Sequence, residues 1–290
     1  MLNEVIELLA VKKDAWYLDG TFGFGGHSSA ILEKGGLVVG ADRDESVIEQ
    51  DKKTFEKEIS ERRLTLVNSR FSELLSNEIV KSHKYSGILF DLGVNSAQLD
   101  TAERGFSFQT DAMLDMRMDT RLGVTAKDLV NGLGRKELYD LLENNAQEHH
   151  SRAIVGALLR SRLMKPIETT RELAAIIQGA VPPRPSKGKS IHPATKTFLA
   201  LRMAVNDELG EIERALPTAL DLLSPSGRLV VLAFHETEDR IIKHTFKTWE
   251  EEGLGVSLTK KPMMPSEEEC MNNPRSRSAK LRAFEKRKEE

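Results

Sequence analysis

The sequence predicts a Rossmann-like α/β fold whose parallel sheet is interrupted by a helical insertion. Short apolar runs alternate with helix-like segments over the first hundred residues, and this alternation returns near residue 207. Between residues 101 and 206 the strand pattern stops, and helical patterns and turns replace it. Alternating strands and helices are typical of a doubly wound parallel sheet. We therefore expect one domain from residues 1–100 and 207–290, and a helical insertion domain at 101–206.

The composition excludes several classes of protein. The chain has 290 residues, of which 39% are hydrophobic and 30% charged, as in a soluble globular protein. No stretch approaches the roughly 18–20 apolar residues of a membrane span, and no secretory signal precedes the first helix, so a cytoplasmic protein is expected. The single Cys270 excludes an internal disulfide and a cysteine-based zinc site. A net charge of −3 argues against a wholly basic nucleic-acid coat, although local basic patches remain open.

The first part of the chain predicts four strands in order. Residues 2–10 have the apolar spacing of an amphipathic helix. The predicted strands are 15–19, 37–42, 64–67 and 86–91, and 44–59 is a predicted helix. A glycine-rich loop at 19–28 joins the first strand to a helix, which is how such sheets bring backbone close to a nucleotide-like ligand.

The rest of the chain predicts helices, then a return to α/β structure. Helical patterns cover 125–130, 135–142, 151–163 and 170–181, followed by a Pro/Gly-rich loop at 182–189. One long helix is expected at 196–223, a strand at 228–234, a helix at 236–248 and a last strand at 256–259. Residues 273–290 form a basic tail with seven lysines and arginines.

Three carboxylates follow predicted strands and indicate a ligand site. Asp19 precedes the glycines, Asp42 ends the second strand and Asp91 ends the fourth. The glycine motif alone is weak, because G-x-G-x-x-G is matched only with Ser28 in the last position. Each aspartate alone is equally well read as a helix N-cap. Together they surround the crevice where doubly wound sheets bind ligands, with Asp42 placed to accept both ribose hydroxyls.

The charge at this loop favours a particular cofactor. A dinucleotide would place its pyrophosphate at the helix N-terminus, where the carboxylate of Asp19 would oppose it. A cofactor with positive charge and no phosphate fits better. S-adenosylmethionine has both a sulfonium and an amino group, so the residues favour a methyltransferase over a dehydrogenase.

Long motifs spread over nearly the whole chain resemble the family of ribosomal RNA small-subunit methyltransferase H, also called MraW. They are DGTFGFGGHS (19–28), DLGVNSAQLD (91–100), RGFSF (104–108), LDMRMD (114–119), HPATKTF (192–198), ALR (200–202), VNDEL (205–209), FH (234–235) with EDR (238–240), and NPRSRSAKLR (273–282). The resemblance implies a class I methyltransferase sheet with a helical insertion. It also implies methylation of the exocyclic N4 of a cytidine in 16S-type rRNA near the decoding site, with S-adenosylmethionine as cofactor and the small ribosomal subunit as partner.

The resemblance also implies site residues. The expected cofactor contacts are Gly25, Gly26, His27, Asp42, Phe71, Asp91 and Gln98. RNA contacts are expected from the loop, from the strand end at 235 and from the tail, at Arg184, Lys187, Lys189, His235, Arg275 and Arg277. The alternative interpretation of the basic tail is a solubilising end, and the alternative interpretation of His235 is a histidine with a purely structural role. Whether the protein is a monomer or a homodimer stays open.

Methyl transfer needs alignment of the amine with the sulfonium methyl, and no metal. The N4 amine of cytosine is a weak nucleophile, so acceptors for its N–H groups should lie just after the fourth strand. We expect Asp91, Asn95 and Ser96 in this role. Asp115 and Asp119 are alternatives, although a loop network bridged by Arg117 explains them equally well.

The chain departs from the family on the substrate side. Asn95 and Ala97 stand where the family has serine and proline, and Ala112 and Met113 replace a glycine–proline pair. Two alternatives to the rRNA enzyme therefore remain: a methyltransferase for another substrate, and a cofactor-binding ribosome-assembly factor with little catalysis.

Overall fold

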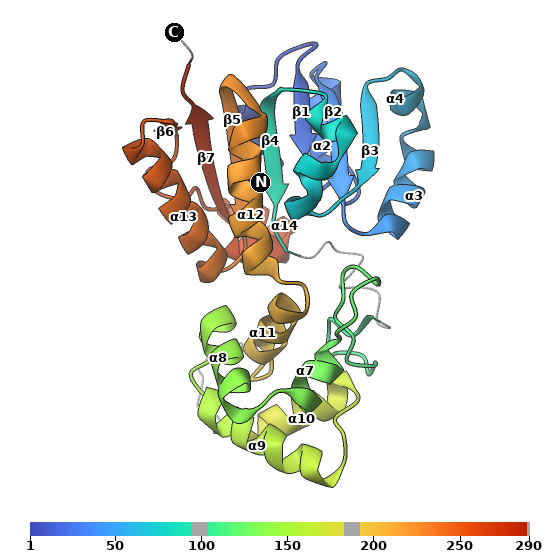
Figure 1. The fold of residues 1–290 in the computed structure, drawn as a ribbon, viewed down its shortest axis with the longest axis vertical. Coiled ribbons are helices and arrows are strands. Elements are labelled where there is room, and N and C mark those ends of the chain that lie inside the picture. Colours follow the sequence, from blue (N-terminus) through green and yellow to red (C-terminus); the bar gives the residue numbers. More distant parts are fainter. Residues whose placement is uncertain (94–103, 183–191, 289–290) are drawn as a thin grey trace. The chain divides into compact units, whose positions relative to one another are not determined.

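A computed structural model describes residues 1–93, 104–182 and 192–288 of the protein. The chain divides into two compact units, one of Met1–Gly93 with Leu209–Glu290 and one of Val94–Glu208 (Figure 1). The sequence placed these boundaries after residues 100 and 206. Each unit has an apolar core of its own. In the described part of the chain, no helix is both long and apolar enough to cross a membrane.

The first unit is built on a seven-stranded sheet with the order β3-β2-β1-β4-β5-β7-β6. Strands β1 to β5 are parallel neighbours, whereas β7 is antiparallel to both β5 and β6. This confirms the predicted α/β fold, with the fourth strand on the other side of the first. The strands are β1 Trp16–Asp19, β2 Leu37–Asp42, β3 Leu64–Asn68, β4 Tyr85–Asp91, β5 Leu223–Ala233, β6 Gly255–Ser257 and β7 Lys280–Lys286.

Helices cover both faces of this sheet because successive strand residues point to opposite sides. Tyr17 and Leu89 pack with apolar residues of α1 (Leu2–Leu9) and α2 (Gly26–Glu33). Leu18 and Ile88 pack on the other face, with α12 (Glu208–Leu222) and α13 (Glu236–Glu251). The remaining short elements are α3 Glu45–Thr54, α4 Glu56–Ser60, η1 Phe71–Ser76, α5 Glu78–Lys81, α14 Glu267–Asn272 and η3 Pro274–Ser278.

Two helices expected to be continuous are broken. The helix predicted at 44–59 ends at Thr54, and α4 begins after Phe55. The long helix predicted at 196–223 is α11 (Thr195–Val205) followed by α12, because Asp207 is left-handed with φ 47°. The side chain of Asn206 fixes this break within the second unit. It donates to the carbonyl of Met116 and accepts from the amide of Met118.

The sequence predicts no strand in the basic tail, but residues 280–286 form strand β7. Leu281 and Ala283 face one core, and Phe284 faces the other. Arg282 is 5% exposed, and its guanidinium donates to both carboxylate oxygens of Asp239, with Nε 2.6 Å from Oδ1. Lys286 donates to two backbone carbonyls. Arg282 and Lys286 therefore stabilise the packing of β7 within the fold.

The second unit consists of helices around one apolar core. Its helices are α7 Ala126–Gly132, α8 Arg135–Ala146, α9 Ser151–Met164, α10 Thr170–Ala180 and α11. Capping boxes begin α7 and α10, where the Thr125 and Thr169 hydroxyls accept from backbone amides three residues on. Phe106 is buried in this core, and Phe108 packs 5.0 Å from the ring of Phe198. Both aromatic side chains therefore belong to the packing of this core.

Candidate active site

The glycine loop lies tightly against strand β4. The amide of Gly20 donates to the Leu89 carbonyl at 2.9 Å, and a Cβ at Gly20 would lie 2.4 Å from the Phe90 ring. Gly25 has φ 71°, a left-handed conformation that favours glycine, and it caps α2. At Gly26 a Cβ would meet nothing within 4 Å, so open space borders the start of the helix.

Asp19 ties β1 to α2. It is 1% exposed, and its carboxylate accepts from the Ser28 hydroxyl at 2.7 Å and from the Thr21 amide at 3.2 Å. Burial raises the pKa of Asp19 to about 6, although these hydrogen bonds oppose the rise. At 1% exposure the Asp19 carboxylate is closed to direct contact, so only its charge can act on a ligand.

Asp91 ends β4 beside the same loop. Its amide donates to the Thr21 hydroxyl at 2.7 Å. The side chain is 31% exposed, yet its Oδ1 atom is buried and accepts no hydrogen bond. Burial raises the pKa of Asp91 to about 6, with His27 opposing and Asp19 reinforcing the rise. A buried acceptor without a partner calls for a ligand that brings an N–H group or positive charge.

Asp42 fixes the loop from β2. It is 9% exposed, and its oxygens accept from the amides of Gly23 at 3.0 Å and Asp44 at 2.9 Å. Burial raises the pKa of Asp42. Each carboxylate oxygen retains a second lone pair, so two ribose hydroxyls can still donate to it. Nearby, Asp51 has a buried Oδ2 without a partner, and burial together with the charge of Asp42 raises the pKa of Asp51 to about 6.

Contacts tie most predicted cofactor residues to one edge of the sheet. Nδ1 of His27 lies 3.7 Å from Oδ2 of Asp91, and burial lowers the pKa of His27. Phe71 begins η1 directly after β3 and is partly buried, with its ring 5.2 Å from that of Phe90. An apolar ring at this edge suits an adenine. Gln98 lies outside the described residues.

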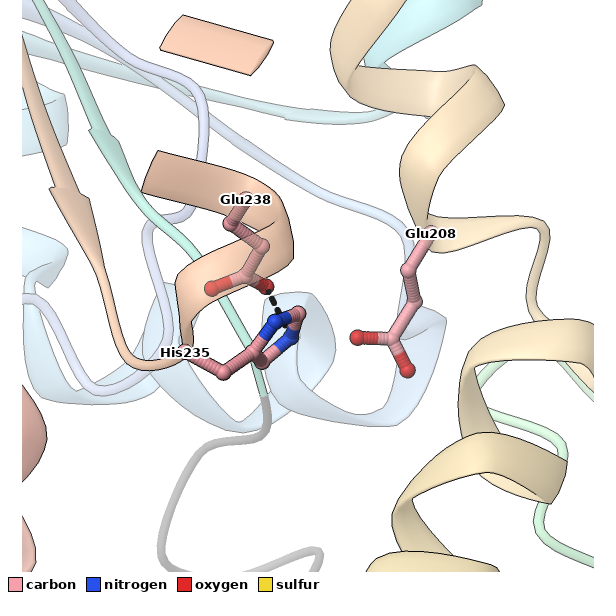
Figure 2. A group of neighbouring side chains, drawn as sticks. All are labelled: Glu208, His235 and Glu238. Atoms are coloured by element: carbon pink, nitrogen blue, oxygen red, sulfur yellow. Dashed lines mark ion pairs between the residues drawn. The ribbon is translucent and has the colours of Figure 1, made fainter. Parts of the chain in front are cut away.

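Strand β5 ends at the same edge as β4, since Leu232 pairs with Asp91. His235 caps α13, and its Nε2 atom is 3.0 Å from Oε1 of Glu238 (Figure 2). The other oxygen of Glu238 accepts from the Phe234 amide at 2.9 Å. Glu238 is fully buried, and its charge raises the pKa of Asp91 further. The sequence motif contained Glu238, but its polar helical surroundings gave no sign that it is buried.

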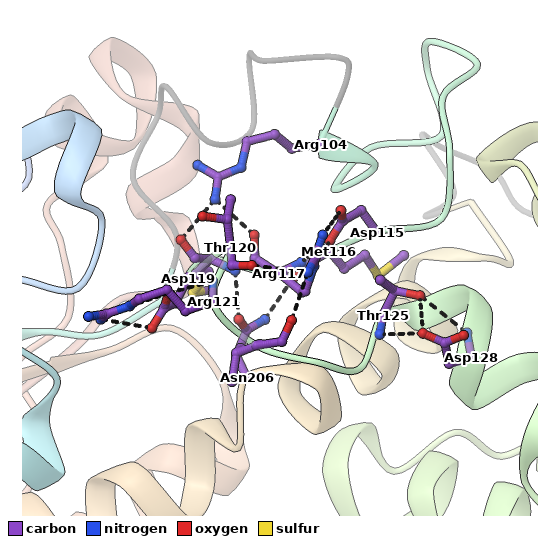
Figure 3. Close-up of polar contacts among 12 residues, drawn as sticks. Arg104, Asp115, Met116, Arg117, Asp119, Thr120, Arg121, Thr125, Asp128 and Asn206 are labelled. Carbon is purple, nitrogen blue, oxygen red and sulfur yellow. Dashed lines mark hydrogen bonds and ion pairs between the residues drawn. The ribbon is translucent and has the colours of Figure 1, made fainter.

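The aspartates of the second unit belong to a structural network (Figure 3). Arg117 donates to both oxygens of Asp115 at 2.7 and 2.8 Å, and Arg121 likewise holds Asp119. Burial acts to raise the pKa of Asp115, but the Arg117 hydrogen bonds outweigh it and lower that pKa. The loop network bridged by Arg117 is the correct interpretation. Glu208 is similarly engaged by Arg202, at 2.8 Å to each carboxylate oxygen.

The remaining predicted residues divide into two groups. Arg275 and Arg277 lie exposed on η3. The others, Asn95, Ser96, Arg184, Lys187 and Lys189, lie outside the described residues.

A largely parallel sheet with a glycine loop, an aspartate ending β2 and an aspartate ending β4 defines a Rossmann-like cofactor-binding domain, and the negative charge around the loop favours a methyltransferase. The chain belongs to the MraW methylase family, whose sequence model matches residues 1–287. The resemblance noted in the sequence is thereby confirmed, and so is its cofactor, S-adenosylmethionine. The residues fit this cofactor, because the charge of the Asp91 carboxylate lies beside the loop residue His27, where it suits a positive group, and the space at Gly26 is open.

Similar proteins have related names. A protein of Acidobacterium capsulatum named ribosomal RNA small subunit methyltransferase H is 43% identical over 99% of this chain and 97% of its own length. A protein of the same name from Caulobacter vibrioides is 44% identical over 98% of this chain and 93% of its length. Among solved structures, an rRNA methylase from Streptococcus thermophilus aligns with 10% identity and a TM-score of 0.44, covering 99% of this chain and 94% of that one.

Proposed function

We propose that this protein transfers the methyl group of S-adenosylmethionine to the exocyclic N4 of a cytidine in small-subunit (16S-type) rRNA, near the decoding site. The family membership supports a methyltransferase, and the names of relatives at 41–44% identity support the small-subunit rRNA as substrate. The resemblance in the sequence motifs supports the N4 position. The small ribosomal subunit is then the partner.

The observation that carries the proposal is the buried Oδ1 atom of Asp91, which lacks a partner. When bound, S-adenosylmethionine supplies an electrophilic methyl group on a sulfonium. The chain's own task is to hold the amine in line with it and raise its electron density. Asp91 accepts a hydrogen bond from an N4–H group, which pushes electron density onto the nitrogen. Asn95 and Ser96, four and five residues further on, are proposed as additional acceptors.

Separate sets of residues are proposed to bind the cofactor and the RNA. The loop residues Gly25, Gly26 and His27 border the cofactor, Asp42 accepts its ribose hydroxyls, and Phe71 lies against its adenine; Gln98 is proposed as a further contact. On the RNA side we propose phosphate contacts from Arg184, Lys187, Lys189, Arg275 and Arg277, since cations supply most of the affinity for a phosphate backbone. A cytidine in structured RNA must be flipped or already unpaired to enter such a pocket.

The substrate class is tested with tritiated S-adenosylmethionine. The protein is incubated separately with small subunits, large subunits and DNA, the ribosomal subunits coming from a strain that lacks this enzyme. We expect label in small-subunit RNA alone. Label in DNA or in ribosomal protein would identify a different methyltransferase. Cofactor binding without transfer to any of them would indicate an assembly factor.

A further inference from the structure

His235 and Glu238 form a pair in which several buried polar atoms lack a hydrogen-bond partner. Both ring nitrogens of His235 and Oε1 of Glu238 are buried, and none makes a hydrogen bond. Nε2 and Oε1 are only 3.0 Å apart, but their geometry is not that of a hydrogen bond. Buried polar side-chain atoms nearly always have a partner, so these three atoms indicate a group that binds there.

The position of the pair relates it to the reaction. His235 follows β5, the strand beside β4, three residues beyond the end of the ladder that joins Leu232 to Asp91. Glu238 is close enough for its charge to raise the pKa of Asp91. The pair and the proposed amine acceptor therefore lie at neighbouring strand ends of one unit. His235 keeps 14% of its side chain exposed although both of its nitrogens are covered, whereas Glu238 is fully buried.

A purely structural role explains the pair poorly. The structural hydrogen bond to the backbone is made by the other oxygen of Glu238, which accepts from the Phe234 amide at 2.9 Å. A histidine kept for packing would have its nitrogens satisfied within the fold, because leaving a buried polar group unpaired costs about 1–3 kcal/mol. Asp239, the next acid on α13, shows the satisfied arrangement, with both oxygens bonded to Arg282.

We propose that His235 accepts the proton which the N4 amine loses during methyl transfer, and that Glu238 positions its ring. This inference rests on the proposed function. Oε1 of Glu238 lies 3.0 Å from Nε2, so its charge favours the tautomer with the hydrogen on Nε2 and leaves Nδ1 with a free lone pair. As N4 bonds to the methyl carbon, the methyl–sulfur bond breaks and its electron pair stays on sulfur as a neutral thioether. The N4 proton passes to Nδ1, and the imidazolium that results is stabilised by the Glu238 carboxylate.

The direct test is His235→Gln, with His244→Gln as the control, because His244 is exposed on the same helix. Removal of a positioned base lowers rates by roughly 10²–10⁴-fold. We expect a loss in this range in single-turnover methyl transfer to small subunits, with cofactor affinity by calorimetry changed less than about twofold. The control should match the wild type. An unchanged rate for His235→Gln, or a parallel loss of cofactor affinity, would overturn the proposal.

Two further measurements separate a chemical from a structural role. His235→Gly leaves a cavity and an acceptable helix N-cap, and added imidazole should restore part of its rate; no recovery in a folded variant counts against a base. Nitrogen-15 NMR of labelled histidine, without cofactor, should show the Nε2–H tautomer at His235 in the wild type. In Glu238→Gln this preference should weaken, and an unchanged tautomer would refute the role of Glu238.

The two proposals fail in different ways. If the wild type methylates N4 but the His235→Gln variant is equally active, His235 is not the proton acceptor and the proposed function stands. If the wild type places its methyl group elsewhere, the proposed function is wrong and the base falls with it, whatever the tautomer.

Discussion

Nδ1 of His27, in the first turn of α2, lies 3.7 Å from Oδ2 of Asp91 at the end of β4. This contact links the glycine loop to the strand that carries the proposed amine acceptor. Burial raises the pKa of Asp91 to about 6 and lowers the pKa of His27. At neutral pH the edge thus holds an ionised Asp91 beside a neutral His27, which leaves the carboxylate charge for a positive ligand.

Cofactor affinity should rise with pH between 5 and 7. Asp91 and Asp19 have a pKa near 6, so both are mainly protonated at pH 5 and ionised at pH 7. A positive cofactor binds the ionised form, and protonation of one such group weakens binding about tenfold at one unit below its pKa. Titration calorimetry at pH 5, 6 and 7 measures this. The Asp91→Asn variant should bind the cofactor weakly, and its affinity should change less with pH. A wild-type affinity independent of pH would contradict the account.

Asp42→Asn should weaken cofactor binding by about 10- to 100-fold. Hydrogen bonds to a charged group contribute about 1.5–3 kcal/mol, and the asparagine removes the charge that the ribose hydroxyls need. Asp42 also accepts from Gly23 and Asp44, so Asp42→Ala would loosen the loop as well. Asparagine keeps one acceptor for the loop. Thermal unfolding of both variants separates the two effects, and an unchanged dissociation constant for Asp42→Asn would refute the ribose assignment.

Two glycine substitutions should separate stability from binding. Gly20→Ala places its Cβ 2.4 Å from the buried Phe90 ring, so overpacking should lower the free energy of unfolding by about 2 kcal/mol. Gly26→Ala meets no protein atom within 4 Å and should leave that free energy nearly unchanged. Its methyl group enters the space assigned to the cofactor, so affinity should fall. Denaturant unfolding measures the stability of both variants, and calorimetry measures their cofactor affinity. Normal cofactor affinity in Gly26→Ala would argue against that assignment.

The strand order around the site could be predicted because each of the first four strands is a short apolar run that stands out in the sequence. Apolar runs such as 37–42 end in an aspartate, and parallel ladders bring such ends to one edge. Strand β7 was missed because charges at Lys280, Arg282 and Lys286 hide its alternation. The buried pairing of Arg282 with Asp239 joins residues 43 positions apart, and no local pattern signals it.

The tail should contain two kinds of arginine. Arg282→Ala leaves the buried Asp239 with only the longer ion pair to Lys280, at 3.8 Å, which should cost about 3 kcal/mol of stability. The paired substitution Arg282→Met with Asp239→Leu should recover most of this loss, as measured by denaturant unfolding. A single variant as stable as the wild type would contradict the buried ion pair.

Arg275→Ala combined with Arg277→Ala should instead leave stability unchanged, since both side chains are exposed on η3. If each contacts one phosphate, RNA binding weakens uniformly and the slope of log affinity against log salt falls by about 2. Fluorescence anisotropy with a labelled rRNA fragment at several salt concentrations measures this slope. A slope equal to that of the wild type would remove both residues from the interface.

The central claim concerns the atom that receives the methyl group. Small subunits from a strain lacking the enzyme are treated with the protein and S-adenosylmethionine, and their RNA is digested to nucleosides for chromatography and mass spectrometry. The account predicts one new N4-methylated cytidine, abolished by Asp91→Asn. A methyl group found on C5, on the ribose 2′-oxygen or on another base would contradict it.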